Sequence, residues 1–167
     1  MVSTMIGVAL TATFAAAQLP ADFSGVWRPV DALSSAIPPP PPPAAGPGGP
    51  PPPPPPPKTI STTIVQSASE LTVRRHMAGA DGPIVQAFTY RLDGGESVNQ
   101  FGPIVFRTTA AWDGAALVLS SALSTEGQPL GVAREVYRLE NGNLVVETNR
   151  RTPAGTFTST GVNARDR

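Results

Sequence analysis

From Thr59 to the C-terminus, short apolar and β-branched runs recur about every ten residues and alternate with polar positions. Each run ends in a turn-forming segment, several of them with Asp-Gly or Asn-Gly, which is typical of antiparallel strands joined by hairpins. Segments long enough for crossover helices are nearly absent, so an all-β fold with up-and-down strand order is favoured. Ten strands are predicted, at 22–30, 59–67, 70–77, 83–92, 96–100, 103–112, 115–123, 130–139, 143–151 and 155–162.

We expect these strands to close into an antiparallel β-barrel of about 8–10 strands. A barrel of about eight strands is just filled by its own side chains, so a wider barrel leaves space inside. Small residues on the expected inner faces, among them Thr108, Ala110, Ser121 and Ser159, favour such a lumen because they fill little volume. A two-sheet sandwich would produce the same periodicity and remains the alternative fold.

Alternation along the strands indicates which side chains share the inner face. Phe88 and Tyr90 share one face of strand 83–92, and Phe106 and Trp112 share one face of strand 103–112. These four aromatic residues are the predicted apolar lining of the lumen.

Two arginines also fall on inner faces by this alternation. Arg75 shares a face with Leu71 and Val73, and Arg150 shares a face with Leu144. A buried arginine is costly unless it meets an anion or an internal carboxylate. Both are therefore candidate ligand anchors.

The alternative is that a lumen arginine is neutralised by Glu135 or Glu147, or lies at an edge in water. Alternation does not assign Arg134, Glu135 or Arg138 to a face, because strand 130–139 has no clear apolar side.

The N-terminal segment 1–17 is uncharged, apolar from Met5, and ends in Ala15-Ala16-Ala17. Small residues at Ala15 and Ala17 are typical of a signal-peptide cleavage site, which predicts export to the periplasm or the medium and a mature domain at 18–167. A basic start is missing from the segment, so we expect the true translation start to lie upstream. The apolar run is shorter than the roughly 20 residues of a membrane anchor, and no stable membrane insertion is expected.

Proline fills most of the segment Pro38–Pro57. Because proline fixes φ and lacks an N–H, we expect a disordered or polyproline II loop, at 31–58, between the first two strands. The loop could dock a protein partner, or it could be a repeat tolerated in an exposed position.

Composition excludes several kinds of protein. The 12 basic and 12 acidic residues give zero net charge, which argues against nucleic acid as a partner. There is no cysteine, and the one histidine, His76, lies on the outward face of its strand. No spacing indicates a metal site, a cofactor or a catalytic group, so we expect no enzyme.

The opening of the first strand, Asp22-Phe23-Ser24-Gly25-Val26-Trp27, contains a Gly-x-Trp motif. With the following proline-containing loop and the hairpins ending in DGGES, AAWDG, LENGN and RTPAGTF, the chain resembles the secreted bacterial lipocalin-like proteins of unassigned activity, which are calycin-type barrels. The resemblance covers most of the mature chain apart from the proline loop.

The resemblance implies that Trp27, preceded by Gly25, plugs the closed end of the barrel, with an arginine from a late strand packed over it; Arg138 and Arg150 are the candidates. It also implies a small apolar or amphipathic ligand in the lumen. The chain differs from fatty-acid-binding proteins, which have two lid helices and an Arg-x-Tyr carboxylate grip near the end. A fatty-acid head-group site is therefore not expected.

Overall fold

The computed structural model describes residues 20–37 and 58–166, which form eleven strands and one three-residue 3-10 helix. The predicted signal segment 1–17 and the proline tract 38–57 lie outside the described residues. The elements are β1 (Gly25–Pro29), η1 (Asp31–Leu33), β2 (Ser35–Ile37), β3 (Lys58–Gln66), β4 (Glu70–Gly79), β5 (Gly82–Arg91), β6 (Ser97–Phe101), β7 (Ile104–Asp113), β8 (Ala116–Thr125), β9 (Gln128–Glu140), β10 (Asn143–Thr152) and β11 (Gly155–Arg165).

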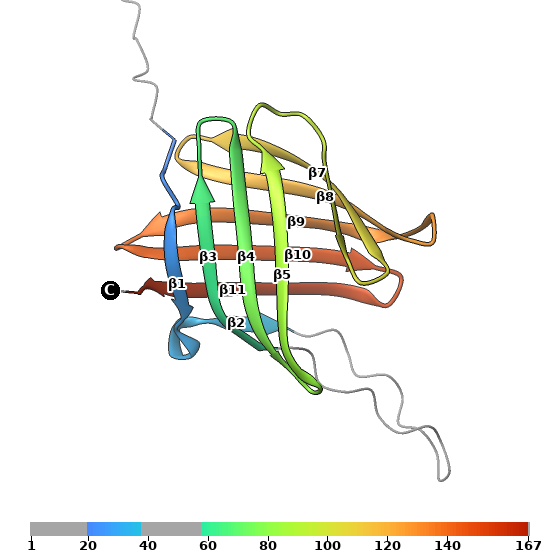
Figure 1. The fold of residues 1–167 in the computed structure, drawn as a ribbon, viewed down its shortest axis with the longest axis horizontal. Coiled ribbons are helices and arrows are strands. Elements are labelled where there is room, and N and C mark those ends of the chain that lie inside the picture. The colour runs from blue at the N-terminus through green and yellow to red at the C-terminus, as the bar shows by residue number, and fades with distance from the viewer. Residues whose placement is uncertain (1–19, 38–57, 167) are drawn as a thin grey trace, which may run out of the picture.

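All strands belong to one antiparallel sheet with the order β5-β4-β3-β1-β11-β10-β9-β8-β7-β6. From β3 onward each strand pairs with its sequence neighbour except at β5 and β6, and β1 lies between β3 and β11. Figure 1 shows the sheet wrapped on itself, with β3 to β5 crossing over β7 to β11. The predicted up-and-down barrel is confirmed. The alternative of a two-sheet sandwich is wrong, because all described strands belong to one continuous sheet.

β5 and β6 are the two ends of this strand order, and no backbone ladder joins them in the described structure. They are connected instead by hydrogen bonds from side chains of β6 to the backbone of β5. The Asn99 amide accepts from the Thr89 N–H and donates to the Thr89 carbonyl oxygen, both at 2.9 Å. The Ser97 hydroxyl accepts from the Arg91 N–H at 2.8 Å. The barrel is therefore nearly closed, with one seam held by polar side chains.

A second irregularity lies beside β1. After Pro29 the chain turns through η1, and β2 then pairs with β11, its residues Ser35 and Ile37 lying opposite Thr160 and Thr158. In the described part of the chain, β2 has no pairing with β3. Among the described residues, β2 and the start of β3 are therefore not joined by a backbone ladder.

The core of the barrel is packed by aromatic and branched side chains. Phe88 and Phe106 lie with ring centroids 4.9 Å apart, and Phe23 stacks on Trp112 at 6.0 Å. Phe23 precedes β1 and enters the core from its loop, fully buried. The buried core also contains Trp27, Ile64, Leu71, Val73, Tyr90, Ala110, Leu117, Leu119, Leu123, Tyr137 and Leu144.

Candidate functional site

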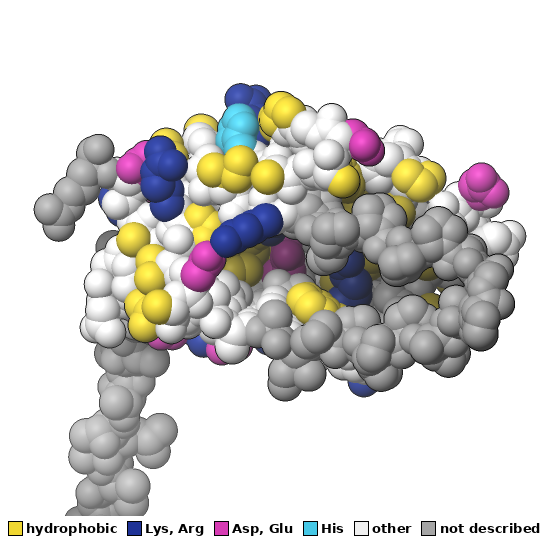
Figure 2. All heavy atoms as spheres, turned by 90° about the horizontal axis from the view of Figure 1, so that it is seen from below, with side chains coloured by type: hydrophobic (Ala, Val, Ile, Leu, Met, Phe, Trp, Pro, Cys, Tyr) yellow, Lys and Arg dark blue, Asp and Glu magenta, His cyan; other side chains and the backbone are white. Residues whose placement is uncertain are grey.

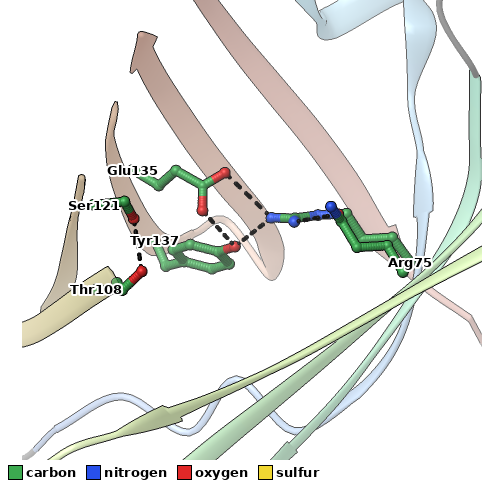
Figure 3. Close-up of polar contacts among 6 residues, drawn as sticks. Arg75, Thr108, Ser121, Glu135 and Tyr137 are labelled. Atoms are coloured by element: carbon green, nitrogen blue, oxygen red, sulfur yellow. Dashed lines mark hydrogen bonds and ion pairs between the residues drawn. The ribbon is translucent and has the colours of Figure 1, made fainter. Parts of the chain in front are cut away.

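Arg75 of β4 lies on the same face as Leu71 and Val73, which are fully buried or nearly so. Because side chains alternate along a strand, this places the Arg75 guanidinium inside the barrel. Figure 3 shows the guanidinium reaching toward β9, which lies across the lumen. The predicted inward arginine therefore lies on the inner face of β4, between the buried residues Val73 and Met77.

The Arg75 guanidinium interacts with three side chains. It donates to the Gln86 side-chain oxygen at 3.1 Å and to the Tyr137 hydroxyl at 2.6 Å, and it forms an ion pair with Glu135 at 3.3 Å. The Tyr137 hydroxyl in turn donates to the second Glu135 oxygen at 3.4 Å. The side chains of Arg75 and Glu135 are 19% and 20% exposed. The lumen thus contains a charge-balanced polar network.

Burial and charge act in opposite directions on this network. Burial alone would lower the pKa of Arg75, but the Tyr137 and Glu135 oxygens raise it above its ordinary value, so the guanidinium stays protonated. Burial raises the pKa of Tyr137 and of Tyr90. Both phenols are therefore neutral near pH 7, and Tyr137 can act as a hydrogen-bond donor.

A cavity of ≈230 Å³ lies beside this network, inside the barrel. Its wall combines the polar groups Ser34, Thr59, Thr62, Arg75, Tyr137, Thr148, Ser159 and Asn163 with Pro29, Leu144, Val146 and Gly161. It lies where the described residues show no pairing of β2 with β3, since Ser34 precedes β2 and Thr59 is at the start of β3. Seen from below in Figure 2, this end of the molecule is hollowed and has charged and apolar side chains at its border.

The residues predicted to line the lumen are placed in three environments. Arg75 borders the cavity. Phe88, Tyr90 and Phe106 are buried in the core cluster, and Trp112 packs against it. Arg150 is exposed, paired with Ala133 and Phe157 near the end of β10. Their contact with a ligand remains a prediction.

Glu135 and Tyr137 are site residues that alternation did not assign or single out. They face inward because Tyr137 pairs with Leu117 and Glu135 pairs with Leu119, both buried leucines of β8. A β-bulge shifts the pairing between Leu123 and Ser124. Alternation counted from the β8–β9 turn would therefore place Glu135 and Tyr137 on the outer face. Their pairing with the buried leucines of β8 is what indicates the inner face.

Glu147 was the other predicted neutralising partner, and it lies on the outer face. Its carboxylate pairs with Arg138 at 2.6 Å. The lumen arginine is therefore balanced by Glu135.

The closed end is formed around Trp27, which is fully buried and donates its indole N–H to the Phe23 carbonyl oxygen at 2.9 Å. The guanidinium over its ring is Arg165, at 4.6 Å from the centroid, so Arg138 and Arg150 were the wrong candidates. A Cβ on Gly25 would lie 3.0 Å from the Arg165 guanidinium, at a φ of +143°, which explains the glycine. The fold is a nearly closed antiparallel β-barrel with Trp27 buried beneath an arginine, as the lipocalin-like resemblance implies.

Comparison with known proteins adds one structural likeness. No protein-family profile and no curated protein sequence matches the chain. Among solved structures, a zebrafish ileal bile acid-binding protein complexed with cholic acid is similar at a TM-score of 0.46 and 18% identity, covering 64% of this chain and 72% of that one.

Two other kinds of site concern the described residues 20–37 and 58–166. In these residues no group of three or more His, Cys, Asp or Glu side chains is arranged to hold a metal ion. His76 lies opposite Val85 on the outer face of β4. None of the helices in the same residues is long and apolar enough to span a membrane.

Proposed function

We propose that the barrel binds one small, uncharged amphipathic molecule in the cavity beside Arg75. The observation that carries this proposal is an internal cavity lined by one charged residue, Arg75, whose charge is already neutralised by Glu135. Binding sites combine apolar surface with a few oriented polar groups, and the lining of this cavity has that character.

The size of the cavity limits the ligand. At ≈230 Å³ it is below the range of about 300–1,000 Å³ typical of drug-sized ligands. The apolar part of the ligand would contact Leu144, Val146 and Pro29, and its polar group would reach Tyr137 and Arg75. Phe88 and Phe106 support the inner wall from the core and do not border this cavity.

The charge balance limits the ligand further. An acidic ligand bound to the guanidinium would leave two carboxylates, its own and that of Glu135, near one arginine. Like charges in a partly buried site oppose each other strongly. A neutral hydroxyl or carbonyl group can instead accept from the free N–H groups of Arg75 without disturbing the pair, because a guanidinium carries five donors.

Calorimetric titration of the protein with 1-octanol and with octanoate tests this function. We expect 1-octanol to bind about tenfold more tightly than octanoate, equivalent to about 1.4 kcal/mol. In Glu135→Gln the arginine loses its counter-charge, so the preference should reverse in favour of octanoate. Ser120→Ala, an exposed position on the outer face of β8, is the control and should behave as the native protein.

Each outcome has a distinct meaning. If neither amphiphile binds, the binding function is wrong. If the native protein prefers octanoate, the cavity binds acids and the neutral-ligand class is wrong.

We also propose that the protein acts after export, on the basis of the signal-like segment 1–17. Binding is favoured over catalysis because both oxygens of Glu135 are engaged within the network and Tyr137 is held neutral. Mass spectrometry of the protein recovered from its own cells would test export: an N-terminus at Gln18 is expected, and a retained segment 1–17 would contradict it.

A further inference from the structure

The outer face of β7 to β11 carries a polar groove that the lumen function does not use. Two hollows of ≈400 and ≈530 Å³ share Arg134 and Asn149, which are paired across β9 and β10. The first hollow extends to Ser35 and Thr160, and the second to Arg107 and Arg151. Together these residues define the outer groove.

The strand register places a row of polar side chains along this groove. Thr109 pairs with Ser120, Ser120 with Arg134, Arg134 with Asn149, and Asn149 with Thr158. Five adjacent strands at roughly 4.8 Å spacing give a row about 19 Å long. Thr109, Ser120, Arg134 and Asn149 are exposed, so the row is available to a ligand that runs across the strands.

The groove is basic although the chain as a whole is neutral. Seven ion pairs occur among the described residues, and neither Arg134 nor Arg151 takes part in them. Glu147, the acidic residue of the lining, is already paired with Arg138 at 2.6 Å. Arg107 is paired with Glu96. The uncompensated charge on this face is therefore positive.

We propose that the outer groove binds an acidic polysaccharide lying across β7 to β11. Arginine presents paired N–H donors that fit a carboxylate, and the Thr, Ser and Asn side chains can exchange hydrogen bonds with sugar hydroxyl groups. The described lining of the two hollows contains no aromatic side chain, and base stacking on aromatic side chains is how single-stranded nucleic acids are usually held. A polyuronate has carboxylates that can pair with the arginines and hydroxyl groups that can hydrogen-bond to the Thr, Ser and Asn side chains.

Binding of the full chain to alginate, measured by calorimetry at low salt with dextran and an oligothymidylate in parallel, tests this proposal. The native protein should bind alginate and neither of the others, and the affinity should fall as salt is added. Arg134→Ser combined with Arg151→Ser should weaken binding by about tenfold. Arg74→Ser is the matched control: Arg74 is exposed on the outer face of β4 and should leave the affinity unchanged.

The variant Asn149→Ala provides a second measure that keeps every charge, and it should weaken binding about threefold while the thermal unfolding curve stays native. The proposal is overturned if the native protein ignores alginate, or if Arg74→Ser weakens binding as much as the double variant. Tighter binding of the oligothymidylate would also overturn it, in favour of a nucleic-acid surface.

Discussion

The guanidinium of Arg75 donates a 2.6 Å hydrogen bond to the hydroxyl of Tyr137, joining β4 to β9 across the barrel. Four strands lie between these two along the sheet, namely β3, β1, β11 and β10. The bond therefore crosses the lumen and does not follow the wall. Both residues border the cavity, and Glu135 balances the charge of Arg75.

Removing only the carboxylate should destabilise the barrel. In Glu135→Leu the Arg75 charge remains in the lumen without a partner, and we expect the free energy of unfolding to fall by about 2–3 kcal/mol. This value is below that for fully buried pairs because each side chain is about one-fifth exposed. Combining it with Arg75→Met should recover most of the loss, since an apolar pair can replace an ion pair. Urea unfolding measures the stability of the single and the double variant. A double variant less stable than Glu135→Leu would contradict the role of Glu135 as the counter-charge of Arg75.

Alkaline pH should reveal the burial of the two tyrosines of the chain, Tyr90 and Tyr137. Burial raises the pKa of both phenols in the folded state, whereas the unfolded state ionises near pH 10. Above pH 10 the unfolded state binds fewer protons than the folded state, so stability should fall as pH rises, by up to about 1.4 kcal/mol per pH unit for each tyrosine. Below pH 9 neither tyrosine should contribute any pH dependence.

Absorbance at 295 nm measures this directly. The folded protein should show no phenolate signal at pH 10.5, and the signal should appear together with unfolding. Tyr90→Phe should halve the slope of stability against pH. A smooth titration near pH 10 in the folded protein would show that the phenols reach solvent.

Gly131, the one glycine of β9, should tolerate a side chain poorly. Its φ is +153°, and a Cβ there would run into the backbone carbonyl of Arg151, which cannot move aside as a side chain can. We expect Gly131→Ala to cost at least about 3 kcal/mol of unfolding free energy. Gly127, at φ +77° with open space around it, is the control and should cost about 1 kcal/mol as alanine. Equal losses in thermal unfolding would contradict the close approach of Gly131 to the Arg151 backbone.

The seam between β5 and β6 should depend on one amide side chain. Asn99→Leu removes both hydrogen bonds to Thr89, and we expect hydrogen exchange at the Thr89 N–H to become about tenfold faster. Gln100→Leu is the control, because Gln100 bonds to Gly102 within its own turn. Nuclear magnetic resonance resolves the exchange of this single amide, and an unchanged rate would mean that the seam is held by other contacts.

Much of the fold could be predicted from the sequence, because hairpin signals and alternation are local properties. All ten predicted strands are present, but β2 was missed: its three residues lie beside the proline tract and show no alternation of their own. The arginine over Trp27 was misassigned because β11 continues to Arg165, three residues beyond the predicted end, and this extension places Arg165 opposite Trp27.

The site was harder to predict for a physical reason. The four predicted aromatics point inward, but Phe23 enters from a loop and stacks on Trp112, so part of the expected lumen is packed by the protein itself. The inner face of β9 depended on a bulge next to Gly131, opposite Leu123 and Ser124 of β8, which no periodic pattern encodes. Arg75 was predictable because its strand has an unbroken alternation, whereas its partners Glu135 and Tyr137 required the register between strands.

Native mass spectrometry of the protein purified from its own cells, compared with Gly161→Leu, tests lumen binding most directly. Gly161 lines the cavity, and a Cβ there would have its nearest neighbours at 3.8 Å, so leucine can fill the space without a backbone clash. The native protein should carry one small molecule at a 1:1 ratio, Gly161→Leu should carry none, and Ala122→Leu on the outer face should keep it. A native protein without any adduct, or an adduct retained in Gly161→Leu, would contradict binding in this cavity.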